Sequence, residues 1–98
     1  MIFAELQYEQ DYSEVHSELV EYLKSKYPSL DCGLQGDSWI WIFDGDEKVA
    51  IDTFSSMTHQ IKSESPKGHL AKQVIEVLST KYKLIEYDDP ELEPHEDF

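Results

Sequence analysis

The chain has 98 residues, with 21 acidic residues, 8 lysines and no arginine, and its formal net charge at neutral pH is −13. Such a charge repels phosphate backbones and anionic lipid headgroups, and it attracts basic surfaces. Without arginine, the chain also lacks the planar guanidinium that binds carboxylates and phosphates through paired hydrogen bonds. We therefore expect neither nucleic-acid binding nor membrane binding.

The length is that of a single domain, and a hydrophobic fraction of 40% with 12% aromatic residues is enough for one folded core. We predict one domain over residues 1–87 and an acidic disordered tail over 88–98, which is rich in acids and proline. The single cysteine, Cys32, forms no internal disulfide, and we find no signal peptide and no apolar run of membrane-spanning length. A cytoplasmic location is expected.

The N-terminal third predicts a strand followed by a helix. Over residues 2–8, alternate side chains are apolar, which is typical of a strand with one buried face. Asp11 has the position of an N-cap, and apolar residues then recur every three or four positions until Pro28 ends the helix. Residues 28–38 predict a loop, and a short irregular strand at 32–35 remains an open alternative within it.

The middle of the chain predicts a hairpin. Aromatic and aliphatic side chains alternate over residues 38–43, which predicts a strand, and Asp44-Gly45-Asp46 predicts a tight turn. Residues 48–54 predict the return strand. A mostly polar run at 57–63 predicts a further strand at the edge of the sheet, where polar side chains discourage self-association.

The last third predicts a second helix and a final strand. Ser65 and Pro66 have the pattern of an N-cap and first helical residue, and apolar residues recur at steps of four up to Tyr82. A short strand at 84–87 completes the order β-α-β-β-β-α-β. We predict an α+β fold, a two-layer sandwich in which a mostly antiparallel sheet carries two helices on one face.

The strand at 38–43 has two apolar faces, with Trp39, Trp41 and Phe43 on one and Ile40 and Ile42 on the other. Both faces being apolar predicts a central strand. One interpretation of Trp39, Trp41 and Phe43 is that they pack in the core. The alternative is a protein-binding face, because tryptophan is a frequent anchor at interfaces. A nucleic-acid stacking platform is excluded because the neighbouring charges are acidic rather than basic.

The negative charge is unevenly distributed along the chain. Residues 1–47 have a net charge of −9, residues 48–87 of +2, and residues 88–98 of −6. The predicted first helix carries acids in its early turns, at Glu14, Glu18 and Glu21. These acids and the tail favour either a basic partner or a merely solvated surface.

Several residues have side chains that catalysis or metal binding would use. Asp44, Asp46 and Glu47 have part of a calcium-loop spacing, but the rest of that loop is missing, so a hairpin turn is the simpler interpretation. Cys32 with His59 or His69 suggests a nucleophile and base or a zinc site.

Three observations count against such chemistry. Asp31 beside Cys32 has the wrong sign of charge to activate a thiol, and the ten-residue spacing of His59 and His69 matches no zinc signature. A hydroxyl-rich segment at 55–59 follows Asp52, but no glycines are present there to form an oxyanion hole.

We predict a small, acidic, non-enzymatic protein-binding or adaptor-type protein that needs no cofactor or metal. Its partner is a protein, either a basic one or a second copy of the chain. The candidate binding residues are Trp39, Trp41, Phe43, Glu14, Glu18 and Glu21. The alternative is a small thiol- or metal-dependent enzyme that uses Cys32, His59 and Asp52.

Overall fold

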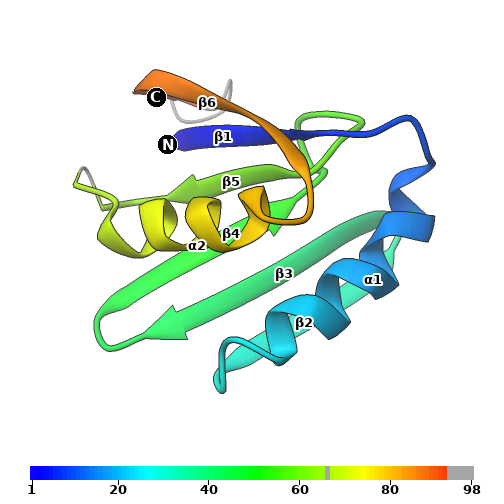
Figure 1. Cartoon of the computed structure of the whole chain (residues 1–98), viewed down its shortest axis with the longest axis horizontal. Helices are drawn as coiled ribbons and strands as arrows, with labels where there is room; N and C mark the ends of the chain where they lie inside the picture. The colour runs from blue at the N-terminus through cyan, green and yellow to red at the C-terminus, as the bar shows by residue number, and fades with distance from the viewer. Residues whose placement is uncertain (66, 93–98) are drawn as a thin grey trace.

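The chain folds into one six-stranded sheet with two helices on one face, in a computed structural model that describes residues 1–65 and 67–92 (Figure 1). The strand order is β2-β3-β4-β5-β1-β6, and every neighbouring pair is antiparallel. In chain order the elements are β1 (Ile2–Gln7), α1 (Tyr12–Lys24), β2 (Leu30–Gln35), β3 (Asp37–Asp44), β4 (Glu47–Asp52), β5 (Gln60–Ser63), α2 (His69–Ser79) and β6 (Lys83–Glu91).

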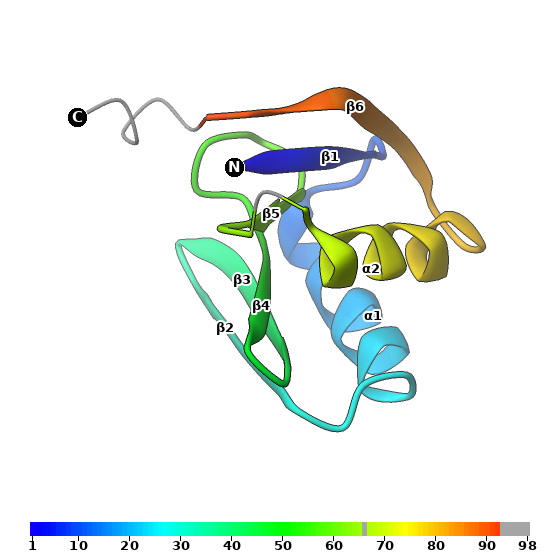
Figure 2. The ribbon, with the colours of Figure 1, turned by 90° about the vertical axis from the view of Figure 1, so that its left-hand side faces the viewer.

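Both helices pack on the same side of a strongly twisted sheet (Figure 2). Helix α1 lies against β2 and β3, and α2 lies against the other four strands. Between the layers is one apolar core, whose completely buried members include Leu6, Leu19, Leu23, Ile40, Ile42, Ile51, Ile61 and Leu78. The predicted α+β class, with a mostly antiparallel sheet and two helices on one face, is confirmed.

Helix α1 begins where the sequence indicates. The Asp11 side chain accepts a hydrogen bond from the backbone N–H of Ser13, which satisfies one of the unpaired donors of the first turn. Tyr22 on α1 donates a hydrogen bond to the carbonyl oxygen of Val77 on α2, so the two helices are also joined to each other.

Helix α2 begins three residues later than predicted. Its first residue is His69, and its N-cap is Gly68 rather than Ser65. Gly68 has a φ of 59°, and a Cβ at this position would lie 2.3 Å from the ring of Phe3 on β1. The close approach of Phe3 selects glycine here, so the helix start depends on a contact with the other end of the chain. Pro66, the predicted first helical residue, lies outside the described residues.

Two strand predictions need correction. Residues 30–35 form a regular strand, each paired with β3, so the element order contains one more strand than predicted. The predicted edge strand at 57–63 is wrong in its position and bounds, because β5 covers Gln60–Ser63 and lies between β4 and β1 with all four side chains buried. β5 is interior because the two terminal strands add beyond it, which no local pattern indicates.

The last strand is longer than predicted. β6 runs from Lys83 to Glu91, beyond the predicted strand at 84–87 and into the segment predicted as a tail. Residues 93–98 of the predicted tail lie outside the described residues. In the described part of the chain, neither helix has the length and apolar character that crossing a membrane requires.

We expect Gly68 to contribute more to the stability of the fold than Gly45. Both have a φ of 59°, but a Cβ at Gly45 would meet no atom within 4 Å. We expect Gly45→Ala to lower the free energy of unfolding by about 1 kcal/mol through backbone strain. Gly68→Ala should lower it by about 3 kcal/mol, because the ring of Phe3 must also move. Urea unfolding followed by circular dichroism measures both losses, and equal losses would contradict this account.

Candidate functional site

Strand β3 divides its side chains between the two faces of the sheet. Ile40 and Ile42 point toward the helices and are fully buried. Trp39, Trp41 and Phe43 point toward the face that neither described helix covers, where each remains partly exposed. We call these three residues the aromatic strip, and the face that carries them the helix-free face. The strip is therefore not part of the core between the layers.

The tryptophan rings of the aromatic strip lie close to each other and to a lysine. The ring centroids of Trp39 and Trp41 lie 4.5 Å apart, with 39° between the ring planes. The ammonium of Lys48, on the adjacent strand β4, lies 3.9 Å from the centroid of a Trp41 ring. At this distance a cation is attracted by the ring's quadrupole. The strip therefore already binds one cation, which belongs to the chain itself.

Glycine at position 33 allows the strip to extend onto β2. Gly33 is directly paired with Trp39, and a Cβ at Gly33 would lie 2.5 Å from atoms of the indole ring. The indole therefore occupies the space above the glycine, as aromatic residues do when they cover glycine in neighbouring strands. The strip reaches the edge of the sheet in this way.

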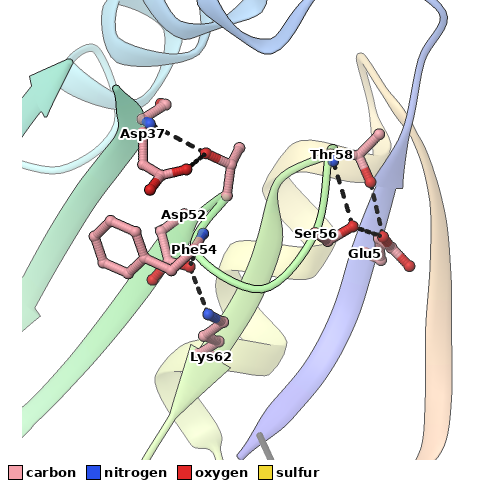
Figure 3. Close-up of polar contacts among 9 residues, drawn as sticks. Glu5, Asp37, Asp52, Phe54, Ser56, Thr58 and Lys62 are labelled. Atoms are coloured by element: carbon pink, nitrogen blue, oxygen red, sulfur yellow. Dashed lines mark hydrogen bonds and ion pairs between the residues drawn. The ribbon is translucent and has the colours of Figure 1, made fainter. Parts of the chain in front are cut away.

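The other half of the helix-free face is closed by its own polar contacts. Asp52 on β4 and Lys62 on β5 form an ion pair of 2.5 Å, and their side chains are only 4% and 6% exposed. Phe54 lies beside this pair, with its ring centroid 5.8 Å from the lysine ammonium (Figure 3). Two buried charges need a partner to offset the loss of hydration, and each supplies it for the other.

Glu5 on β1 holds the connection between β4 and β5 over this half of the face. Its carboxylate accepts hydrogen bonds from the hydroxyls of Ser56, at 2.6 Å, and Thr58, at 2.8 Å (Figure 3). The connection curls toward the helix-free side of the sheet (Figure 2). It leaves the aromatic strip as the more open part of that face.

A hollow of about 320 Å³ lies beside β4 and β5, lined by residues of both strands and of the segments that follow β3 and β5. Its lining includes Ala50, the residue paired with Trp41, and the ion pair of Asp52 and Lys62. Ala50 has the smallest side chain of this group, which explains why the surface is lower at its position.

The acidic residues predicted as partners of the strip lie on the other layer of the molecule. Glu14, Glu18 and Glu21 belong to α1, which packs on the opposite face of the sheet. Glu18 accepts a hydrogen bond from the hydroxyl of Tyr82 and lies 3.5 Å from the ammonium of Lys81. The structure therefore brings Trp39, Trp41 and Phe43 together but separates them from the three glutamates.

A chain of buried polar side chains joins the two layers. The Tyr8 hydroxyl and His59 Nδ1 are 2.7 Å apart, His59 Nε2 and the Ser38 hydroxyl are 2.7 Å apart, and Ser38 and His16 Nδ1 are 2.5 Å apart. In the arrangement with both imidazoles neutral, the Tyr8 hydroxyl, which also accepts the backbone N–H of His59, donates its own proton to Nδ1. His59 Nε2–H then donates to Ser38, and Ser38 donates to His16. Every member is satisfied when both imidazoles are neutral.

Burial shifts the pKa values of this chain in the direction that keeps its members neutral. The pKa of His59 is lowered from 6.5 to about 4, mainly by burial and also by the neighbouring His16. Burial lowers the pKa of His16 and raises that of Tyr8 to about 12. Ser38 resembles an activated nucleophile in its contacts with two histidines. It is completely buried, however, and its geometry serves to join α1 to β3.

The residues of the alternative, enzymatic prediction are engaged separately. His59 bonds to Tyr8 and Ser38, whereas Asp52 pairs with Lys62, and neither is hydrogen-bonded to Cys32. Within residues 1–65 and 67–92, no group of three or more histidine, cysteine, aspartate or glutamate side chains is arranged to hold a metal ion. Asp44 is the last residue of β3 and Asp46 lies in the β3–β4 turn, as the hairpin interpretation requires.

Sequence reasoning missed the polar residues that shape both faces. Ser38 begins the strand predicted over residues 38–43 and His16 lies within the predicted first helix, and no local pattern relates either of them to His59. Lys62 offered a weak signal for the ion pair. A lysine within an interior strand is buried and needs an acidic side chain nearby. For Glu5 the signal was its place on the polar face of an otherwise apolar strand.

No protein-family model, curated protein or solved structure matches this chain.

The covering of Gly33 by Trp39 is testable by fluorescence. In a Trp41→Phe background, Trp39 is the only tryptophan, since the chain has two. We expect Gly33→Ala to displace the indole from β2 into water, because the new methyl group would lie within 2.5 Å of the ring. The emission maximum should shift to longer wavelength with little change in the far-ultraviolet circular dichroism. An unchanged emission maximum would refute the proposed contact.

The buried imidazole of His59 predicts a pH-dependent stability. A histidine whose pKa is lower in the folded state binds its proton more readily when unfolded, so stability decreases with decreasing pH. The contribution of His59 should be complete above pH 6.5 and be lost between pH 6.5 and its folded pKa of about 4, a loss of about 3 kcal/mol.

Urea unfolding between pH 4 and 7 measures this dependence. His59→Gln should show a shallower decline in stability than the wild type, while the exposed His69→Gln should follow the wild type. Parallel curves for all three proteins would show that His59 does not cause the decline.

Proposed function

We propose that this chain is a small, acidic, non-enzymatic protein-binding protein of the adaptor type, which engages a basic protein through the aromatic strip. One observation carries the proposal. Trp39, Trp41 and Phe43 lie partly exposed together on the sheet face that the two described helices leave uncovered. Aromatic side chains are enriched at the centres of interfaces and dominate the affinity when they are fully desolvated there.

The charge around the strip supports a basic partner. Asp31, which is paired with Trp41, is exposed at its border, and Asp46 is exposed in the adjoining β3–β4 turn. The contact of Lys48 with Trp41 is an example, within this chain, of a cation on the strip. A second copy of the chain carries the same net charge of −13, so its approach is opposed by electrostatic repulsion.

The hollow and the acidic helix have separate roles in this proposal. The hollow of about 320 Å³ at Ala50 has room for one side chain of the partner, between Lys48 and the ion pair of Asp52 and Lys62. The glutamates of α1 lie on the far layer, so they act by long-range attraction that raises the rate of encounter rather than by contact. The single cysteine, Cys32, suits a cytoplasmic setting.

The enzymatic alternative gains no support from the described residues. Cys32, His59 and Asp52 do not converge, and His59 and Asp52 are already engaged by other side chains. We therefore advance the binding function alone.

Replacing one anchor of the strip tests the proposal. We expect Trp41→Ser to weaken partner binding about thirtyfold, since a central interface tryptophan typically contributes about 2 kcal/mol or more. The immobilised protein is incubated with a native lysate at low and high salt, and a specifically retained protein is then titrated against both forms. Met57→Ser is the control, because Met57 is more exposed, at 76%, and lies outside the strip.

Three results would contradict the proposal. In the first, the wild type and Trp41→Ser bind the partner equally. In the second, Trp41→Ser and Met57→Ser lose the same affinity for it. In the third, high salt does not reduce the amount of partner that the immobilised protein retains. Circular dichroism confirms that both variants remain folded.

A further inference from the structure

The sheet has two edges that differ in how they are protected. Edge strands expose unpaired backbone groups, and proteins protect them with proline, lysine and other charges. At one edge, β6 carries Pro90 together with Lys83, Glu86, Asp88 and Asp89. At the other edge, β2 has neither proline nor lysine, and its only charged residue is Asp31. Its six residues pair with β3 on one side. In the described part of the chain, no strand or side chain pairs with the other side.

Side chains on both faces of β2 are suited to receiving another strand. On the helix side, Leu34 is 41% exposed, and Leu30 and Cys32 are partly exposed while packing against the core. On the helix-free side, Gly33 is covered by the indole of Trp39. A strand placed beside β2 would therefore meet apolar side chains on one of its faces and the border of the aromatic strip on the other.

We propose that β2 pairs with an extended segment of the basic partner, so that the partner adds a seventh strand to the sheet. This inference rests on the proposed function, and it specifies how the partner binds. Main-chain hydrogen bonds to β2 supply affinity, and alternate side chains supply specificity, as in other cases of strand addition. The added strand carries apolar residues that cover Leu30, Cys32 and Leu34.

The opposite face of the added strand carries lysine or arginine. These side chains face the indole of Trp39 and the carboxylate of Asp31, which is directly paired with Trp41. Cation–π attraction and opposite charge both favour them there. A second copy of the chain would instead bring another molecule of net charge −13 to this edge, which argues against β2–β2 pairing.

A synthetic peptide of five Arg-Val repeats, blocked at both ends, serves as the probe. We expect its addition to the full chain to slow amide hydrogen exchange within residues 30–35 at least tenfold, while exchange in β6 is unchanged. Exchange measured by NMR resolves the individual amides. Protection of β6 to the same extent, or no protection of 30–35, would overturn the inference.

Two control peptides separate strand pairing from charge attraction. In one control peptide every valine is N-methylated, and in the other every arginine is N-methylated. Because alternate residues of a strand direct their N–H groups to the same edge, each control peptide keeps the charge but loses the N–H donors of one edge. Pairing through a single edge predicts that one of them binds at least tenfold more weakly than the parent, while the other binds like the parent. Equal binding by all three peptides would overturn the inference.

Two further outcomes distinguish this inference from the proposed function. If the retained partner depends on Trp41 but gives no protection within residues 30–35, strand addition is wrong and the binding function stands. If the peptide pairs with β2 but no protein depends on Trp41, the binding function is wrong and the edge assignment stands. If sedimentation shows a dimer, and residues 30–35 are protected in it without peptide, the strand beside β2 belongs to a second copy of the chain and the inference of a partner strand is wrong.

Discussion

Two helices can cover only one face of a six-stranded sheet, and the rest of this structure depends on that constraint. The face beneath α1 and α2 receives the aliphatic side chains, including Ile40 and Ile42, and becomes the core. Because side chains alternate along a strand, the same stretch of β3 must present Trp39 and Trp41 to the opposite side. A large aromatic surface outside the core is thus a direct consequence of the layer arrangement.

The two halves of the helix-free face differ in how far they are covered. Across β5 and β1, buried polar contacts and the β4–β5 connection close it, and Phe54 lies beside the pair of Asp52 and Lys62 (Figure 3). Across β2 and β3 the aromatic strip remains open toward an unprotected sheet edge. The buried chain from Tyr8 to His16 joins α1, β3 and the start of β5. It therefore holds the open half and the closed half in a fixed relation, as long as its histidines stay neutral.

The sequence predicted what depends on local periodicity and missed what depends on distant pairing. The alternation of residues 38–43, the N-cap at Asp11 and the β3–β4 turn were predictable because each is determined by neighbouring residues. The interior position of β5 was not, since it results from the pairing of strands at the two chain ends. The same is true of the site. The strip was visible in the alternation, but its separation from the glutamates of α1 follows only from the way the helices cover the sheet.

Site-specific photo-crosslinking on the helix-free face tests the central claim most directly. A diazirine-bearing lysine analogue in place of Lys48, whose ammonium lies 3.9 Å from a Trp41 ring centroid, reports what touches the strip in the native cell. The same analogue in place of the exposed Lys72 on α2 is the matched control on the helix side. The account predicts adducts with a basic protein from position 48 that are absent from position 72. Adducts that are the same at both positions, or none at position 48, would contradict it.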